Sequence, residues 1–366
     1  MILRCPKIFQ ICTFTVMSMY RNITLCFFII IASFFSFAQN EKTIAFQINS
    51  EQGQFIPHKP ALNYLIQGKS IGLAFSIEKR KKDSISYGLT ASILNSGNPE
   101  VIGLVYGLNG FTSFPLTKKE NGMRLKIGIG LGYVEKIFDA NTNNRNIVIG
   151  SHINTKIVFR AEKEFTLSKN NHFNLGVGVC HFSNGAYQTP NLGINFLLFN
   201  MGYSYIKTTS LKKEKKPFNT NYALDRKWLY AVIFSGGIRE NPSPLREKYP
   251  IINLCNRVNY VQSAKNNFTG GIDFTYNPGI LHRTHIPLDV SPLQSGIFIG
   301  NERNFDRLTF AVDMGVYLFN QNMKSLIYHR FGIHYQLINK IHILLQLKSH
   351  WAAAEAFEFG IKYRIK

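Results

Sequence analysis

Two residues of this sequence, His181 and Ser183, combine the side-chain types and the spacing that nucleophilic catalysis requires. Side chains two residues apart on a strand point to the same face, with Cβ atoms roughly 6.5–7 Å apart, so the imidazole can reach the hydroxyl. A serine needs a base to take its proton and a third group to hold that base in the right tautomer. Asn195, on the next predicted strand, could supply this third contact. We therefore predict His181, Ser183 and Asn195 as the catalytic residues.

The turn that follows Ser183 offers donors for a developing negative charge. A tetrahedral intermediate of acyl transfer needs N–H groups aimed at its oxyanion. The side chain of Asn184 and the backbone N–H groups of Gly185 and Ala186 are the local candidates. The sequence therefore predicts an oxyanion site directly after the nucleophile.

The residues before and after this turn alternate with the period of two that a strand requires. Bulky side chains occupy the odd positions of 173–179, and small or polar ones occupy the even positions of 174–180. In an outer-membrane barrel the bulky stripe faces lipid and the other stripe lines the interior. His181, Ser183 and Asn195 continue the bulky stripes of their two strands. We therefore expect all three to face the lipid, where chemistry on a lipid is their most plausible use.

Similar alternating segments recur from residue 43 to the end of the chain and predict an all-β fold, an antiparallel outer-membrane β-barrel. The segments run for ten to fourteen residues, against the ~5–6 usual in soluble sheets, and Tyr and Phe gather near their ends. A soluble β-sandwich is the weaker alternative. Strands are expected near 44–48, 71–77, 86–94, 99–112, 123–133, 151–165, 171–184, 193–206, 228–238, 251–263, 267–277, 294–300, 308–318, 325–338, 341–347 and 357–365.

The preferred architecture is one barrel of about 14–16 strands, in which the aromatic last strand closes on the first. Residues 39–206 would supply the strands that carry the motif, 207–225 a basic polar loop, and 226–366 further strands of the same barrel. The alternative is a second eight-stranded barrel formed by 226–366. With the N-terminus in the periplasm, the strand of His181 is about the seventh, so the turn after it would lie at the outer surface.

Residues 1–38 have the order of a secretory signal peptide. They carry three positive charges, no acidic residue, and an almost wholly apolar run at 25–35 that leads to Ser36-Phe37-Ala38. A transmembrane anchor is the alternative, but the apolar run is shorter than the ~20 residues that a membrane span needs. We therefore expect cleavage after Ala38 and export to the cell outer membrane.

The basic balance of the chain points to an anionic partner. Removal of the three charges of residues 1–38 lowers the net charge from +21 to +18. Export argues against nucleic acid, and lipopolysaccharide phosphates in the membrane are the expected partner, with solubility alone as the alternative. Cys180 and Cys255 match no metal-site spacing, and we expect interior packing for Cys180, with a bridge between the two as a lesser option. No metal and no cofactor is expected.

The turn region also resembles the signature of a known family. Its residues follow the pattern His-x-Ser-Asn-(Gly/Ala) and then Pro-Asn-x-Gly-Ile, here His181, Ser183, Asn184, Gly185, Pro190, Asn191, Gly193 and Ile194. This pattern resembles that of the lipid A 3-O-deacylases, also described as acyloxyacyl hydrolases. The resemblance implies an outer-membrane barrel that removes an ester-linked acyl chain from lipid A with a lipid-facing His/Ser/acid triad. It implies that His181 is the base, Ser183 the nucleophile and Asn184 a helper of the oxyanion.

The chain departs from this resemblance at Asn195, where the family carries its triad glutamate. An amide can orient a histidine but stabilises its charged form less, and loss of the acid from a serine triad can cost about 10⁴ in rate. Asp139, Glu355 and Glu358 are the acids that could substitute. The motif covers only about fifteen residues, and a looser likeness extends over about 70–206.

The sequence leaves three alternatives open. A non-enzymatic barrel, either a channel or a scaffold, would account for a second half that catalysis does not need. An outer-membrane phospholipase would use the same catalytic group on a different headgroup. His350-Trp351 with Glu355 is a weaker second site, and His58, His152, His172 and His285 lack partners at ligand spacing.

Overall fold

The computed structural model describes residues 41–80, 85–117, 122–210, 227–242, 246–282, 290–305, 307–321, 325–351 and 353–365. The predicted signal peptide and most of the predicted loop 207–225 therefore lie outside the described residues. Apart from sixteen strands, the regular structure described consists of two short 3-10 helices, η1 (Pro60–Leu65) and η3 (Pro278–Ile280). Within these ranges, no helix has the length and apolar character needed to cross a membrane.

The first half of the chain forms a closed antiparallel barrel in which consecutive strands are neighbours and β8 returns to β1. Its strands match the predicted segments in number and position, although several extend further. They are β1 (Glu41–Phe55), β2 (Ser70–Arg80), β3 (Ser86–Asn95), β4 (Leu104–Pro115), β5 (Arg124–Val134), β6 (Ile153–Thr166), β7 (Asn171–Ser183) and β8 (Ile194–Ser210).

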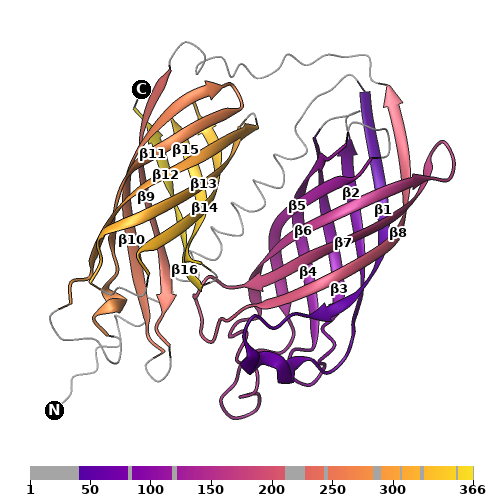
Figure 1. Ribbon diagram of the computed structural model, residues 1–366, viewed down its shortest axis with the longest axis horizontal. Helices are drawn as coiled ribbons and strands as arrows, with labels where there is room; N and C mark the ends of the chain where they lie inside the picture. Colours follow the sequence, from indigo (N-terminus) through magenta and orange to yellow (C-terminus); the bar gives the residue numbers. More distant parts are fainter. Residues whose placement is uncertain are drawn as a thin grey trace.

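The second half forms another closed antiparallel barrel, again with consecutive strands as neighbours. Its strands are β9 (Trp228–Glu240), β10 (Lys248–Ser263), β11 (Asn266–Tyr276), β12 (Leu293–Phe305), β13 (Leu308–Phe319), β14 (Ile327–Ile338), β15 (Ile341–His350) and β16 (Ala353–Arg364). The two barrels are seen from the side in Figure 1, where β9–β16 lie on the left and β1–β8 on the right.

The prediction of a single barrel is therefore wrong, and the alternative of two eight-stranded barrels is the one adopted. β1 pairs with β8 from Glu41↔Ser210 to Phe55↔Phe196, so the first sheet leaves no edge for β9. The last strand, β16, pairs with β9 from Phe359↔Gly236 to Arg364↔Ala231 instead of with the first strand. Alternation in a sequence determines which face each residue takes, but not which strand closes the sheet.

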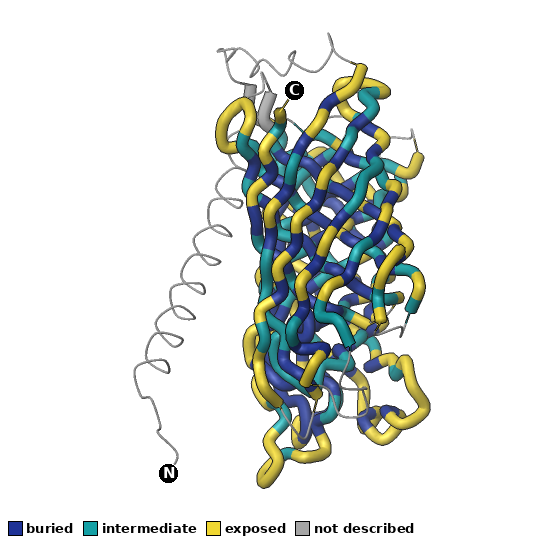
Figure 2. The backbone as a smooth tube through the Cα atoms, turned by 90° about the vertical axis from the view of Figure 1, so that its left-hand side faces the viewer, coloured by how far each residue is buried: buried dark blue, intermediate teal, exposed yellow. Residues whose placement is uncertain are grey.

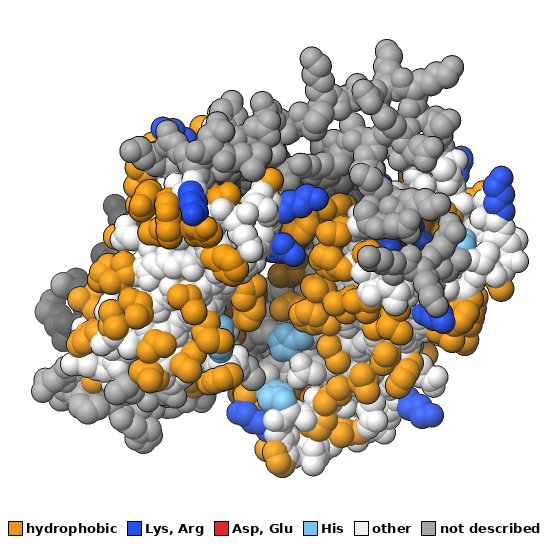
Figure 3. All heavy atoms as spheres, turned by 45° about the horizontal axis from the view of Figure 1, so that its top comes forward, with side chains coloured by type: hydrophobic (Ala, Val, Ile, Leu, Met, Phe, Trp, Pro, Cys, Tyr) orange, Lys and Arg blue, Asp and Glu red, His pale blue; other side chains and the backbone are white. Residues whose placement is uncertain are grey.

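Buried and exposed residues alternate along the strands of both barrels (Figure 2). In β2, Ile71 and Leu73 are about half exposed, whereas Ala74 and Ser76 are buried. Figure 3 shows the resulting surface, with hydrophobic side chains spread over the outer walls of both barrels. An apolar outer wall around a polar interior is the pattern of an outer-membrane β-barrel.

Buried charged side chains fill the middle of the first barrel and pair with one another. Lys126 Nζ lies 2.8 Å from both Gln47 Oε1 and Glu162 Oε1. Arg80 donates to Glu164 at 2.6 Å, and Arg160 pairs with Glu51. Eight strands enclose a space that side chains can just fill, so these ion pairs occupy the interior.

The second barrel has an interior of the same kind. Lys362 Nζ lies 2.6 Å from Glu302 Oε1, and Arg257 Nη1 lies 3.1 Å from the same carboxylate oxygen. Arg330 pairs with Asp273 at 3.0 Å. Because buried charges are costly unless paired, these networks require the eight-stranded closure that brings distant strands together.

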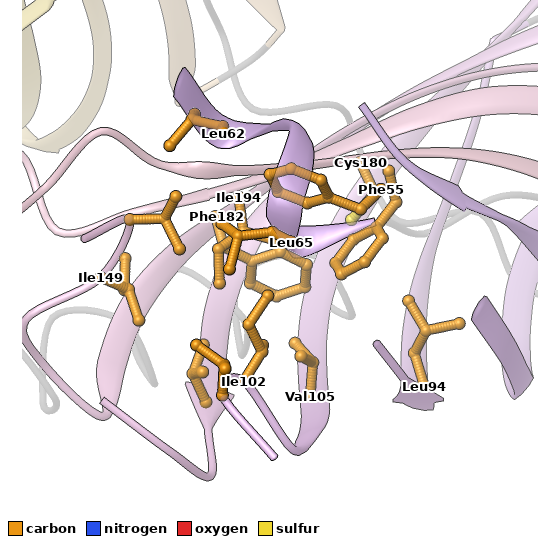
Figure 4. Packing of buried hydrophobic residues seen from close by; sticks show 14 of the residues in the cluster. Phe55, Leu62, Leu65, Leu94, Ile102, Val105, Ile149, Cys180, Phe182 and Ile194 are labelled. Carbon is orange, nitrogen blue, oxygen red and sulfur yellow. The ribbon is translucent and has the colours of Figure 1, made fainter. Parts of the chain in front are cut away.

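An apolar cluster closes the first barrel at the end where β7 runs into β8. Phe55, Leu65, Phe182 and Ile194 are almost completely buried there, and Cys180 packs with them (Figure 4). The helix η1 lies over this cluster and contributes Leu62 and Leu65. The cluster therefore supports the β7–β8 turn from the inside of the barrel.

Candidate active site

His181 and Asn195 face each other across the hairpin of β7 and β8, where the register pairs them directly. Val179 and Leu197, the next residues on the same stripes, are exposed on the outer wall, and Phe182 points inward. His181 Nδ1 lies 2.7 Å from Asn195 Oδ1. An amide oxygen only accepts, so this bond puts the imidazole proton on Nδ1 and leaves the Nε2 lone pair available as a base.

The Asn195 amide also contacts His58, which lies between β1 and η1. Asn195 Nδ2 is 3.3 Å from His58 Nδ1. Since the amide oxygen already faces His181, the amide nitrogen donates here and His58 accepts, which requires a neutral imidazole. Partial desolvation lowers the pKa of His58, and the nearby Lys59 and His181 lower it further. His58 therefore favours the neutral form that this contact needs.

No role for His58 was predicted from the sequence. It is separated from Asn195 by 137 positions, and the two meet only because β8 pairs with β1 to close the first barrel. A sequence pattern carries no signal for such a contact, because barrel closure is a long-range event. The structure thus adds a fourth side chain to the predicted group.

The Ser183 hydroxyl is held by Asn191, from the far side of the β7–β8 turn. Asn191 Nδ2 donates to Ser183 Oγ at 3.0 Å, and the Gly185 N–H lies 3.3 Å from the same oxygen. The opposite contact, from the hydroxyl to Asn191 Oδ1, is longer at 3.3 Å, and this amide oxygen already accepts the Asn184 N–H. The contacts of Ser183 Oγ among the described residues are thus with Asn191 and the Gly185 N–H, and no hydrogen bond joins it to His181.

The turn after Ser183 is tight and has left-handed backbone at its centre. Gly185 and Ala186 have φ of 65° and 63°, and the Tyr187 N–H bonds to the Asn184 carbonyl at 3.3 Å. Two central residues with positive φ are the mark of a type I′ turn. Such a backbone costs an alanine roughly 1–2 kcal/mol, so the surrounding contacts must hold it.

Asn184 is engaged in bracing this turn. Its Nδ2 donates to Ser151 Oγ at 2.7 Å and to the Gln188 carbonyl at 2.8 Å, which uses both of its amide protons. The backbone N–H groups of Gly185 and Ala186 remain the candidates for an oxyanion site, and the Gly185 N–H points here to Ser183 Oγ at 3.3 Å. Asn184 supports them by holding the turn.

Gly193 makes room for the imidazole on the return path of the chain. Its φ is 84°, and a Cβ placed on it would lie 2.6 Å from His181 Cε1. Any larger residue would push His181 from its place. Pro190 directly precedes Asn191, so motif residues contact both Ser183, through Asn191, and His181, through Gly193.

The acids considered as substitutes for the family's glutamate have other surroundings. Asp139 Oδ1 accepts three bonds from Asn141 and Thr142 in its own loop. Glu358 bonds Gln346 inside the second barrel, and Glu355 lies there too, 3.5 Å from Lys348. The Nδ1 of His181 is already engaged by Asn195.

The remaining candidates fall outside this site. His350 bonds the Tyr317 hydroxyl at 2.9 Å and lies 3.7 Å from Glu355, within the second barrel. Cys180 and Cys255 are free and buried in different barrels, so Cys180 packs in the interior as predicted and the bridge is absent. His285 lies outside the described residues.

Comparison with solved structures gives distant matches to porins. A multiple mutant of the Rh. blastica porin and a triple mutant of the Rhodopseudomonas blastica porin are 9% and 8% identical to the chain. Each alignment covers 89% of this chain and 100% of the porin, with a TM-score of 0.20. A similarity this low carries no argument about fold or function. Among curated proteins, none matches the chain.

Two family models match the chain, one for each barrel. The model of lipid A 3-O-deacylase (PagL) matches residues 69–204, which include the whole β7–β8 turn. The model of the acyloxyacyl hydrolase C-terminal domain matches residues 228–366. Together the two models span most of both barrels, so the chain belongs to the family of lipid A 3-O-deacylases, the acyloxyacyl hydrolases.

Proposed function

We propose that this protein is an outer-membrane lipid A deacylase in which Ser183 is the nucleophile, His181 the general base and Asn195 the residue that orients the base. The observation that supports this most is the 2.7 Å contact between His181 Nδ1 and Asn195 Oδ1 on the outward-facing wall. It sets the tautomer in which Nε2 can accept a proton. Family membership supplies the reaction class, ester hydrolysis on lipid A.

The proposed reaction proceeds in two steps. Ser183 Oγ attacks the ester carbonyl carbon of an acyl chain while its proton passes to His181 Nε2. The N–H groups of Gly185 and Ala186 receive the oxyanion, and His181 returns the proton to the departing sugar oxygen. Water then attacks the acyl-serine with His181 again as base, which releases the fatty acid and restores Ser183.

The surroundings fit a substrate whose reactive ester lies at the membrane surface. The β7–β8 turn lies at the end of the barrel opposite to the start of β1, which is the outer surface if the N-terminus is periplasmic. Exposed cations in neighbouring loops at this end, Lys59, Lys136 and Arg145, could meet lipid A phosphates. Lipopolysaccharide of the outer leaflet is thus the proposed partner.

The filled interiors favour an enzyme over a channel. In the described part of each barrel, paired charges and apolar side chains occupy the cross-section. An eight-stranded barrel leaves no room for a wide aqueous path beside them. The chemistry is therefore expected on the outer wall.

Mass spectrometry of lipid A after exposure to the purified protein tests this proposal. We expect the wild type to remove one ester-linked acyl chain and Ser183→Ala to lose at least about 10³-fold in rate, because the nucleophile is removed. Ser168→Ala, in the exposed turn between β6 and β7 at the other end of the barrel, is the matched control and should retain full activity.

A second substrate in the same assay separates the related activities. Vesicles of ester-linked phospholipid without lipid A should remain intact. Hydrolysis of the phospholipid alone would replace lipid A by a phospholipid as substrate, and equal activity of wild type and Ser183→Ala on lipid A would refute the assignment of Ser183.

A further inference from the structure

The second barrel holds the turn that carries the candidate active site. The Ala186 carbonyl of this turn accepts the Glu240 N–H at 2.9 Å. The Thr189 N–H donates to Glu240 Oε2 at 2.7 Å, and the Thr189 carbonyl accepts Arg246 Nη2 at 3.0 Å. The turn is thus bonded at two residues to the end of β9 and to the segment that follows it, where the two barrels meet at their lower ends (Figure 1).

Glu240 is the centre of this contact. It is 3% exposed, and its two carboxylate oxygens serve different partners: Oε2 the Thr189 N–H, and Oε1 the Arg246 Nε at 3.2 Å. Hydrogen bonds to a charged acceptor are about twice as strong as neutral ones. A buried carboxylate that is fixed by an arginine therefore forms a rigid anchor for the turn backbone.

Packing on both sides of this anchor strengthens the attachment. A Cβ at Gly185 would lie 2.2 Å from the Phe357 ring of β16, so glycine lets the turn lie flat against this ring. Lys248 Nζ lies 3.8 Å from the centre of the Tyr187 ring, a cation–π contact. The turn is therefore held between the hairpin of its own barrel and the outer wall of the other.

The anchored residues are next to those that contact Ser183. Thr189 is two positions before Asn191, which donates to the Ser183 oxygen at 3.0 Å. Ala186, whose carbonyl is bonded to the second barrel, has the strained φ of 63° and carries one of the candidate oxyanion N–H groups. A shift of the turn would therefore displace the nucleophile's support and the oxyanion site together.

We propose that Glu240 is a positioning residue for deacylation, through which the second barrel holds the β7–β8 turn in its reactive shape. This inference rests on the proposed function and gives the second barrel a role in it. Glu240 touches neither of the reacting side chains. Its carboxylate acts through Thr189, whereas the bond to Ala186 is made by its backbone N–H and persists when the side chain is replaced. A displacement of about 1 Å at such a distance from the chemistry can cost 10² in rate.

Steady-state kinetics of the full-length protein on lipid A in mixed micelles tests the proposal. We expect Glu240→Ala to lower kcat by 10- to 100-fold and to change KM less than twofold, because substrate contacts remain while the geometry of the turn is lost. Glu240→Gln retains a carbonyl acceptor for the Thr189 N–H and should recover most of kcat. Glu247→Gln is the matched control, since this exposed carboxylate bonds Tyr249 of its own hairpin.

Hydrogen exchange provides a second readout that needs no activity. In Glu240→Ala the hydrogen-bonded amides of Tyr187, Gln188 and Thr189 should exchange at least tenfold faster than in the wild type, while those of β2 should not change. Heat-modifiable migration in gels checks that both barrels remain folded.

The outcomes separate the two proposals. An active wild type with Glu240→Ala equally active, or with slow exchange preserved in the turn, would overturn the positioning role and leave the deacylase assignment intact. An inactive wild type would refute the deacylase assignment and with it any catalytic role of Glu240. Loss of kcat with faster exchange in the turn, restored by Glu240→Gln, would support both.

Discussion

An amide beside the candidate catalytic histidine orients the imidazole without a charge to stabilise its protonated form. Asn195 binds His181 through Oδ1 and His58 through Nδ2, so its orientation is set from both sides. A carboxylate at this position would add electrostatic stabilisation of the imidazolium that forms in the transition state. Asn195 is therefore expected to hold His181 in one tautomer but to give a lower reaction rate than a carboxylate would.

Replacement of Asn195 by the family's acid should make the enzyme faster. We expect Asn195→Glu to raise kcat at least about tenfold at neutral pH, because the imidazolium gains a countercharge, and Asn195→Leu to lower it by about 10². Initial rates of acyl-chain release at saturating lipid A are the measurement. An Asn195→Leu protein as active as the wild type would remove Asn195 from the mechanism.

The contact between His58 and Asn195 predicts an unusually steep loss of activity in acid. The pKa of His58 is lowered by desolvation, Lys59 and His181, so His58 accepts the amide proton until the pH falls below the range of a free imidazole. Protonation of His58 removes this acceptor, and protonation of His181 removes the base. The logarithm of kcat/KM should therefore fall with a slope approaching two.

His58→Gln tests whether protonation of His58 contributes to this loss, because a glutamine carbonyl can accept from Asn195 and does not titrate. The slope of its acid limb should drop to one, with the rate at pH 8 within about threefold of the wild type. A wild-type slope of one, unchanged in His58→Gln, would show that the contact does not influence the reaction.

The hairpin of β7 and β8 is the element that brings the group together. Its register puts Asn195 opposite His181, and the strand period keeps both on the outer wall. The turn then returns Asn191 to Ser183. One short segment therefore supplies the proposed base, the proposed nucleophile and the residues that contact them, and its backbone leaves little space for larger side chains.

Gly193 is where this lack of space is most severe. Gly193→Ala should destabilise the barrel by about 1–2 kcal/mol, because its φ of 84° is unfavourable for alanine, and should lower kcat at least tenfold by pushing His181 aside. Gly270→Ala is the control, since an added Cβ there meets only the Phe298 carbonyl, at 3.5 Å. Urea unfolding in detergent and lipid A kinetics are the measurements; equal behaviour of the two variants would contradict the steric argument.

At the scale of the whole molecule, two narrow barrels replace one wide one. Each closes on itself, and each fills its interior with paired charges such as Lys126–Glu162 and Lys362–Glu302. A ring of sixteen strands would have enclosed a lumen in which these side chains could not have met. Neither barrel, as far as the structure describes it, therefore encloses the wide pore expected of a channel.

Planar-bilayer recordings should accordingly show no stable conductance steps of porin size from the purified protein. Regular porin-like steps from the wild type would favour the channel alternative.

Glu302→Ala leaves Lys362 and Arg257 buried without their shared partner. It should lower the free energy of unfolding of the second barrel by about 3–5 kcal/mol, so that this barrel unfolds at a lower urea concentration.

Local sequence patterns were sufficient to predict much of this molecule. The period of two predicted the strands and the outer-wall positions of His181 and Asn195, because side-chain direction on a strand depends only on position. Ser183 shares this parity but is only 9% exposed. The spacing within the β7–β8 segment predicted the contact between His181 and Asn195, since hairpin neighbours are close in sequence. Local pattern also predicted an all-β barrel with a lipid-facing apolar wall.

Only the tertiary structure decided what depends on contacts between distant residues. The return of β8 to β1 determined that there are two barrels and brought His58 to Asn195. The packing of the second barrel against the turn brought Glu240 to Thr189. Strand alternation is the same whichever partner a strand edge meets, so closure is decided by which interior can be filled and its charges paired.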